Sequence, residues 1–185
     1  MPKNAIVAVD FSNITSAFED IRRKSGLDPR SKLDLEKLVN IATMGSNVAS
    51  KTVYVETRST DDQVGQRKFL YQFSVKGFNV VTKEVKRIWT GVGTKEKANF
   101  DVEITTDISD SFWRRDCDEI ILLSGDSDFE YLLSKIKKRG GISVTIVSSD
   151  DTVSRELRAL ADRLILIGHD VKMEEISFIN SKSAQ

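Results

Sequence analysis

The hydrophobic and polar positions of this chain follow two alternating patterns along almost its whole length. Short apolar runs bounded by polar or glycine-containing stretches are typical of buried strands. Stretches with apolar residues three or four positions apart are typical of helices with one buried face. The two patterns predict strands at residues 5–9, 51–56, 78–85, 120–123, 142–147 and 163–167, and helices at residues 14–24, 33–44, 63–76, 98–114, 129–139 and 154–161.

Strands that alternate with helices form parallel β-α-β units. The sequence therefore predicts an α/β fold: a three-layer α/β/α domain with a central parallel sheet. We expect one domain over residues 1–176 and a polar, frayed C-terminal tail over residues 177–185. Residues 86–97 contain glycines and are expected to form a loop before the helix at 98–114. The positions expected to be buried in that helix are Phe100, Val102, Ile104, Ile108 and Phe112.

Acidic residues follow three of the predicted strands. They are Asp10, Asp126, Asp128, Asp150 and Asp151. Asp101 adds a further carboxylate from the first turn of the helix that begins near residue 98. Ligands of open parallel sheets bind beyond the carboxyl ends of the strands, and carboxylates gathered there repel one another unless they are protonated or neutralised by a cation. Because oxygen ligands without His or Cys suit Mg²⁺ or Mn²⁺, the pattern indicates a divalent-metal site.

Some of these residues also have purely structural explanations. Ser127 or Asp128 can cap the helix at 129–139, because short polar side chains accept hydrogen bonds from the free N–H groups of a first turn. An acidic residue in a first turn, such as Asp101, is stabilised by the helix dipole. Asp107 lies six positions after Asp101, about 120° away around the helix, so the two carboxylates are not expected to share a face.

Composition excludes several classes of site. The chain has 28 basic and 28 acidic residues, so net charge does not argue for a polyanionic partner. A single cysteine, Cys117, rules out an internal disulfide and a zinc–cysteine cluster, and the single histidine, His169, leaves little room for a His-rich metal site. No apolar run approaches 18 residues and no N-terminal apolar signal is present, so we expect a soluble, cytoplasmic protein without membrane contact.

Four segments resemble a known family in their order along the chain. Asp10-Phe11-Ser12-Asn13 resembles a D-x-S-N opening, and residues 97–102 resemble a K-x-x-D-V segment. Residues 124–129 read S-G-D-S-D-F, and residues 154–162 resemble an S-x-x-L…A-D segment. Together they are similar to the NYN domain family, the LabA-like branch of the PIN-like nucleases. The resemblance spans residues 5–167 and implies a PIN-like fold.

The resemblance also implies a site and a reaction. The metal-binding, catalytic carboxylates would be Asp10, Asp101, Asp126 and Asp128, holding Mg²⁺ or Mn²⁺. Asn13 and Ser124 would orient them or a bound water, with Asp107 outside the direct ligands. The implied activity is that of a ribonuclease, in which metal-activated water cleaves RNA phosphodiester bonds; one ion or two both fit.

The sequence departs from the family pattern at two places. Phe11 stands where a small residue is usual, and Asn99-Phe100 replace a common Gly-Val before the helix aspartate. Either departure is expected to narrow the site or to alter access of the substrate.

Basic and aromatic residues precede Asp101 in the chain. The candidate nucleic-acid-binding residues are Lys86, Arg87, Trp89, Lys95 and Lys97. Cations can contact phosphates and an indole can stack on an unpaired base, as in single-strand binders, but a solvated loop with Trp89 against the core explains the same residues. The basic residues at 22–24 and 135–139 are interpreted as cations at helix C-termini, where the dipole favours them.

Three functions compete on this sequence. The first is a metal-dependent ribonuclease acting on single-stranded or structured RNA. The second is a non-catalytic nucleic-acid- or protein-binding module on the same fold, which would gain nothing from clustered carboxylates. The third, a phosphatase with an aspartyl nucleophile, requires a second Asp two residues after Asp10, where Ser12 stands instead. The sequence is silent on oligomeric state, so a homo-oligomer stays open.

Overall fold

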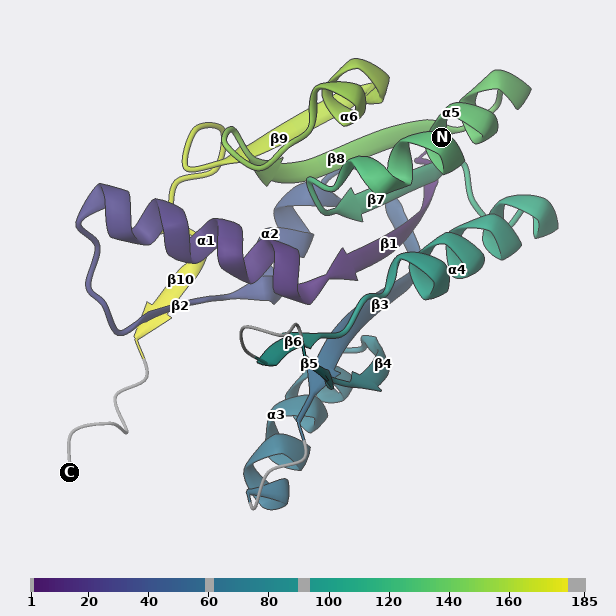
Figure 1. Ribbon diagram of the computed structural model, residues 1–185. Helices are drawn as coiled ribbons and strands as arrows, with labels where there is room; N and C mark the ends of the chain where they lie inside the picture. Colours follow the sequence, from purple (N-terminus) through teal and green to yellow (C-terminus); the bar gives the residue numbers. More distant parts are fainter. Residues whose placement is uncertain (1, 59–61, 90–93, 180–185) are drawn as a thin grey trace.

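The computed structural model describes residues 2–58, 62–89 and 94–179, with backbone alone at 86–89 and 94–97. Its centre is a six-stranded parallel sheet in the order β4-β3-β1-β7-β8-β9 (Figure 1). The strands of the sheet are β1 (Asn4–Asp10), β3 (Asn47–Thr57), β4 (Asn79–Glu84), β7 (Glu119–Leu123), β8 (Ser143–Ser149) and β9 (Arg163–Ile167). The predicted parallel sheet is confirmed.

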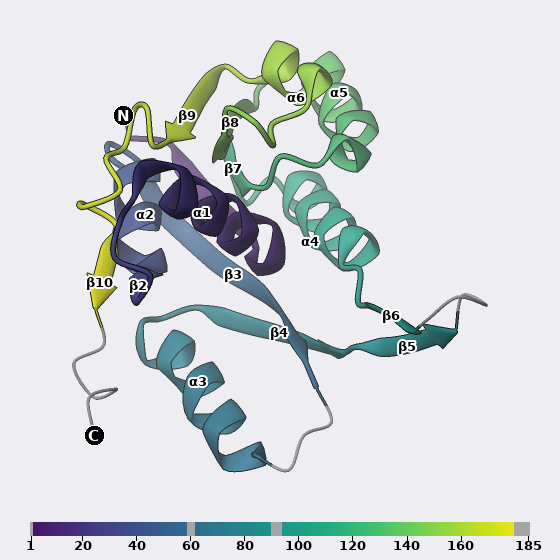
Figure 2. The same cartoon turned by 60° about the vertical axis from the view of Figure 1, so that its left-hand side comes forward.

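Helices cover both faces of this sheet, as Figures 1 and 2 show from two directions. One face packs against α1 (Phe11–Ser25), α2 (Leu35–Ala42) and α3 (Gln63–Val75); the other packs against α4 (Asp101–Arg114), α5 (Glu130–Arg139) and α6 (Arg155–Leu160). Successive side chains of a strand point to opposite faces, so Val7 and Val9 of β1 enter the first core and Ile6 and Ala8 enter the second. The predicted three-layer α/β/α domain is confirmed.

The order of strands places the site. The chain runs outward from β1 to β3 and β4, then returns through α4 to β7 on the other side of β1. The direction of winding therefore reverses between β1 and β7. Helices α1 and α4 both begin at this edge of the sheet and pack on its opposite faces, which leaves a crevice between them. A crevice of this kind lies beyond the carboxyl ends of the two strands and is the usual ligand site of such sheets.

Several helices begin elsewhere than the periodicity predicts, and capping explains two of these shifts. The first helix starts at Phe11 rather than near residue 14, because the Asp10 carboxylate accepts a hydrogen bond from the backbone N–H of Asn13 and caps it. The second starts at Leu35 rather than residue 33, capped by Asp34, and Ser31–Leu33 form strand β2 instead.

The segment before α4 differs most from expectation. Lys86–Trp89 form β5 and Thr94–Lys97 form β6, an antiparallel pair where a loop was expected, and the helix begins at Asp101 rather than residue 98. The side chains of Lys86, Arg87, Trp89, Lys95 and Lys97 lie outside the described residues, so their nucleic-acid contacts stay predictions.

Two smaller expectations are wrong. Val102 is 74% exposed, because it lies about 200° around α4 from the buried Ile104, whereas Ile104 and Ile108 are buried as predicted. Ser177–Ile179 form strand β10, paired antiparallel with β2, so these residues of the expected tail are not frayed. The domain boundary at residue 176 stays a prediction. In the part of the chain that the structure describes, no helix is long and apolar enough to cross a membrane.

Candidate metal centre

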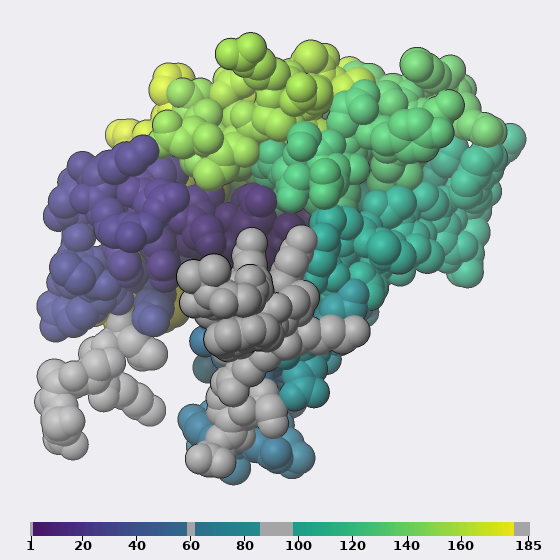
Figure 3. All heavy atoms as spheres, viewed as in Figure 1, coloured from purple at the N-terminus to yellow at the C-terminus, as the bar shows by residue number. Residues whose placement is uncertain are grey.

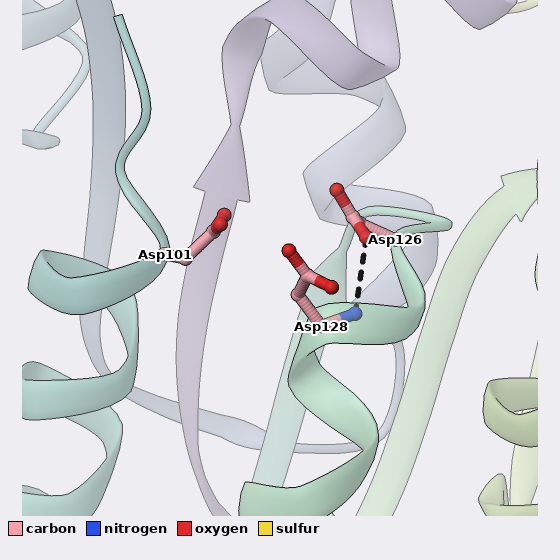
Figure 4. Close-up of side chains that lie close together, drawn as sticks. All are labelled: Asp101, Asp126 and Asp128. Atoms are coloured by element: carbon pink, nitrogen blue, oxygen red, sulfur yellow. Dashed lines mark hydrogen bonds between the residues drawn. The ribbon is translucent and has the colours of Figure 1, made fainter.

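Three carboxylates from two separate segments meet at the crevice between β1 and β7. Asp101 is the first residue of α4, and Asp126 and Asp128 follow β7. Each offers one oxygen atom, and these three oxygen atoms all lie within 4.8 Å of one another. Figure 4 shows the side chains pointing toward a common space. Such an arrangement brings together the oxygen ligands that Mg²⁺ and Mn²⁺ prefer.

The electrostatics of Asp101 reflect this crowding. Partial burial raises the pKa of Asp101 above its usual value; a hydrogen bond from Asn99 opposes the shift, and the charges of Asp126 and Asp128 add to it. Carboxylates so close to one another are unfavourable when all are ionised, unless a proton or a cation lies between them. The oxygen-only donor set therefore fits a divalent cation.

Asp10 lies beside these three residues rather than among them. It lines the same cavity, about 320 Å³ in volume, as Asp101, Asp126 and Asp128. Burial raises the pKa of Asp10, hydrogen bonds from the Asn13 N–H and the Ser12 hydroxyl oppose the shift, and the charge of Asp126 adds to it. All four predicted carboxylates thus face one cavity, and three of them form its tightest cluster.

The turn after β7 is capped by Asp126, not by Ser127 or Asp128. An Asp126 carboxylate oxygen accepts the backbone N–H of Asp128 at 3.0 Å, which begins the 3₁₀ turn η1 (Ser127–Phe129) (dashed line in Figure 4). Helix α5 has no side-chain cap of its own. Capping therefore does not account for the Asp128 carboxylate, which is exposed at the cavity.

Asn13 and Ser124 hold the two strand ends together. The side-chain oxygen of Asn13 accepts the backbone N–H of Gly125 at 3.1 Å, linking the start of α1 to the turn after β7. The Ser124 hydroxyl oxygen accepts the N–H of Asp126 at 3.3 Å, and its hydrogen bond to Asp10 lowers the pKa of that carboxyl. Both residues lie where they can position the carboxylates.

Asp107 lies elsewhere. Its carboxylate accepts a hydrogen bond of 2.7 Å from the Tyr54 hydroxyl, and it does not line the acidic cavity. Burial and this bond raise the pKa of Tyr54.

Cys117 is buried. Burial, and to a smaller extent the charges of Asp118 and Asp116, raise the pKa of its thiol to about 11, so the thiol is not activated.

The departures from the family pattern have distinct consequences. Phe11 packs against Phe69 and Phe73 with ring centroids 5.7 and 5.3 Å away, and it does not line the acidic cavity. Phe100 is buried, and its ring centroid lies 5.8 Å from that of Tyr54. Phe100 also lines the acidic cavity. Phe11 therefore does not narrow this cavity, and an effect of either departure on substrate access stays a prediction.

Asn99, which the sequence marks only as a departure from the family pattern, is a residue of the site. Its amide nitrogen donates to the Asp101 carboxylate at 2.6 Å, and its side-chain oxygen accepts the Asp101 N–H at 2.8 Å. Asn99 is held in turn by Lys83, whose ammonium group donates to the Asn99 carbonyl at 2.7 Å and pairs with Glu103 at 2.5 Å. A polar Asn two residues before a helical Asp is a signal for this kind of local bonding.

We expect Asn99→Ala to weaken Mn²⁺ binding by about 10- to 100-fold while the fold persists, because residues that orient metal ligands typically contribute that much to affinity. Calorimetric titration of the metal-free protein with Mn²⁺ measures the affinity. Asn40→Ala, at an exposed position of α2, is the matched control and should bind as wild type does. Equal affinities for Asn99→Ala and wild type would contradict the positioning role.

The fold and the cavity together define a class of protein. A parallel α/β/α sheet with carboxylates gathered at its winding reversal is a nuclease-like domain with an acidic site. The sequence pattern of the NYN domain matches residues 4–168, and the chain belongs to the NYN domain family, whose members are typically nucleases. The predicted family resemblance is confirmed.

Two relatives extend this comparison. The chain is 30% identical over 169 residues to the Low amplitude and bright protein LabA of Synechococcus elongatus, covering 89% of this chain and 83% of that protein. It is also similar to the crystal structure of a protein of unknown function from Vibrio parahaemolyticus, with 28% identity and a TM-score of 0.72 over 92% of this chain and 96% of that one. Both matches span nearly the whole domain.

Proposed function

We propose that this protein is a divalent-metal-dependent ribonuclease whose metal ligands come from Asp10, Asp101, Asp126 and Asp128. The observation that carries the proposal is the gathering of three carboxylate oxygens within 4.8 Å of one another, from segments 25 residues apart in the chain (Asp101 and Asp126). Membership of the NYN family supports nucleic acid as the substrate class. The choice of RNA, and of Mg²⁺ or Mn²⁺, is part of the proposal.

The chemistry follows from the donor set. A divalent ion held by these carboxylates lowers the pKa of a water molecule and offsets charge on the scissile phosphate. The residues of the chain do the rest. All four carboxylates would hold the cation: Asp101, Asp126 and Asp128 offer the three clustered oxygens, and Asp10 lines the same cavity. Ser16 and Asn99 also line the cavity, and we expect their side chains to donate hydrogen bonds to phosphate oxygens.

The direct test is cleavage. Purified protein is incubated with labelled single-stranded RNA, structured RNA and DNA of the same sequence, each with Mn²⁺, Mg²⁺ or EDTA. The proposal predicts cleavage of RNA that requires the metal and stops with EDTA. Absence of cleavage with every metal, while RNA still binds, would instead support the non-catalytic binding module. Cytoplasmic location and a homo-oligomeric state stay predictions.

Metal binding should also be visible without substrate. We expect Mn²⁺ at about 100 times its dissociation constant to stabilise the wild-type fold by about 2.7 kcal/mol, because a ligand that binds only the folded state shifts the equilibrium by RT ln(1 + [L]/Kd). Thermal melts with Mn²⁺ and with EDTA measure the shift. Asp128→Asn should lose most of this stabilisation by Mn²⁺, because it removes one of the three clustered carboxylates. Its fold should persist, because the Asp128 carboxylate has no capping role. An unchanged melting temperature in wild type would refute the metal site.

A further inference from the structure

A groove between α4 and α5 begins at the acidic cavity. Its walls carry Thr105, Ser109 and Trp113 from α4 and Tyr131, Lys135 and Arg139 from α5. Asp128 lines both this groove and the acidic cavity, so the two hollows adjoin at that residue. The two helices lie side by side in Figures 1 and 2, and their surfaces meet on the right-hand side of Figure 3. We name this groove the α4–α5 track.

The spacing on α5 makes the track continuous. Tyr131, Lys135 and Arg139 are four positions apart and form one stripe along α5, and Asp128 lies three positions before Tyr131, in the 3₁₀ turn η1 that leads into the helix. From Asp128 to Arg139 the stripe extends about 16 Å, at 1.5 Å per residue. Trp113 and Arg139 also line the next hollow, toward Gly140. The stripe therefore leads away from the carboxylates for the length of about four or five stacked nucleotides, at about 3.4 Å each.

The aromatic residues of the track are unusually exposed. Tyr131 is 69% exposed and Trp113 is 59% exposed. Each ring has a cation over one face: Lys135 Nζ lies 5.2 Å from the Tyr131 centroid, and the Arg139 guanidinium lies 4.2 Å from the Trp113 centroid. Phe112 also packs against Trp113 in an edge-to-face arrangement, with ring centroids 5.3 Å apart. A cation on one face helps to hold each ring in place, and the exposed part of the ring can stack on a planar ligand.

The charge of the track is positive beyond Asp128. Among the residues that the structure describes, neither Lys135 nor Arg139 forms an ion pair with a carboxylate, and Asp128 is the one acidic residue that lines the groove. The dipole explanation of these cations accounts for their place in the last turns of α5 but not for their contact with aromatic rings. Exposed rings with unpaired cations are how proteins bind single-stranded nucleic acid, by stacking on bases and contacting phosphates.

We propose that the α4–α5 track binds a single strand of RNA and delivers it to the acidic cavity, with bases stacked on Tyr131 and Trp113 and phosphates near Lys135 and Arg139. The proposal rests on the proposed function and adds to it the form and the path of the substrate. Continuity with the cavity selects this occupant. A ligand that passes Asp128 into a cluster of carboxylates needs phosphates to bind the cation there, and a single strand brings both bases and phosphates.

Binding in EDTA tests the track separately from cleavage. Fluorescence anisotropy with a labelled 12-nucleotide RNA compares wild type with Tyr131→Ala/Lys135→Ala. Loss of one stacked base and one phosphate contact should weaken binding at least about fivefold, and the salt dependence should flatten by about 0.7 in log–log slope. The control is Lys68→Ala/Tyr71→Ala on α3, which removes the same residue types; Tyr71 is also 69% exposed. The control should bind within about twofold of wild type.

The outcomes separate the two proposals. If the track variant binds weakly and the control binds normally, the track is supported even when wild type cuts no RNA with any metal. Equal binding by the track variant, the control and wild type would overturn it and leave the groove to a different partner, such as a protein. Failure of wild type to bind RNA overturns it as well. Tighter binding of a hairpin duplex than of the single strand would do the same.

The fluorescence of Trp113 tests base stacking without substituting any residue of the track. The chain has two tryptophans, so Trp89→Phe leaves Trp113 as the only indole. Titration of this variant with the single-stranded RNA should quench its emission, because a stacked base contacts the indole. Emission that is unchanged at saturating RNA would overturn stacking on Trp113.

Discussion

Asp126→Asn is expected to lower the rate of RNA cleavage by about 10³-fold or more. Asp126 is the member of the cluster that all the others adjoin: its charge raises the pKa of both Asp10 and Asp101, and its oxygen lies within 4.8 Å of those of Asp101 and Asp128. Loss of a carboxylate that holds the catalytic ion removes several kcal/mol of transition-state stabilisation, and each 1.36 kcal/mol is a factor of about ten. Single-turnover cleavage with saturating Mn²⁺ measures the rate.

The substitution is informative because the fold should survive it. An Asn oxygen can still accept the Asp128 N–H, so the cap of η1 persists. Loss of one charge also relieves repulsion in the metal-free protein, which should melt at or above the wild-type temperature at neutral pH, in EDTA. A variant that is destabilised and still responds fully to Mn²⁺ would show that Asp126 serves the turn and not a metal.

The control for this variant is another acidic residue at a strand end. Asp150 follows β8 and its carboxylate pairs with Arg158 at 2.8 Å, outside the acidic cavity. Asp150→Asn removes the same charge from the same edge of the sheet, and it should cleave RNA within about twofold of wild type. Equal losses in both variants would mean that net charge, rather than ligation, controls the rate.

Gly125→Ala is expected to destabilise the fold by about 3 kcal/mol or more and to disorder the acidic turn. A β-carbon at Gly125 would lie 2.3 Å from the Thr152 carbonyl oxygen and 2.6 Å from the Ser148 hydroxyl. The nearest contact is backbone, which cannot rotate away, and overpacking of this kind typically costs about 1–3 kcal/mol and occasionally more. The turn is also tied by the Gly125 carbonyl, which accepts the Ser154 N–H at 3.0 Å. Urea denaturation measures the loss of stability.

Gly26→Ala separates steric overlap from backbone strain. Gly26 ends α1 at φ 68° in the left-handed region, and no atom lies within 4 Å of an added β-carbon. Alanine there should cost about 1–2 kcal/mol through its backbone conformation alone, and RNA cleavage by the folded protein should stay unchanged. A Gly125→Ala protein as stable as Gly26→Ala would show that the Thr152 segment shifts to admit the methyl group.

Much of the architecture could be predicted from the chain because it depends on local patterns. The run at 120–123 is buried on both faces and forms β7 as expected, and the helix expected at residues 14–24 lies within α1. Element ends were less certain. Asp10 was expected to end a strand, and it does, but its second role as the cap of α1 depends on a backbone N–H three residues later.

Contacts between segments distant in the chain could not be predicted from the sequence. Nothing in the periodicity of residues 98–114 indicates that Lys83 on β4 pairs with Glu103 and holds Asn99. The Lys83 side chain is only partly exposed, and its ammonium group bonds within the protein to Glu103 and to the Asn99 carbonyl. The pairing of β10 with β2 is of the same kind, because short edge strands carry weak hydrophobic patterns.

By itself the sequence determined the layers of the fold, the family, and the acidic residues that end β1 and follow β7, because burial on both faces of a parallel strand leaves a readable apolar run. Only the tertiary structure decided which carboxylates meet. The winding reversal beside β1 brings the start of α4 next to the turn after β7, so that Asp101 joins Asp126 and Asp128. Asp107, six residues further along α4 and on another face of the helix, binds Tyr54. The α4–α5 track likewise exists only because two separate helices pack side by side, and packing of that kind depends on contacts across the whole domain.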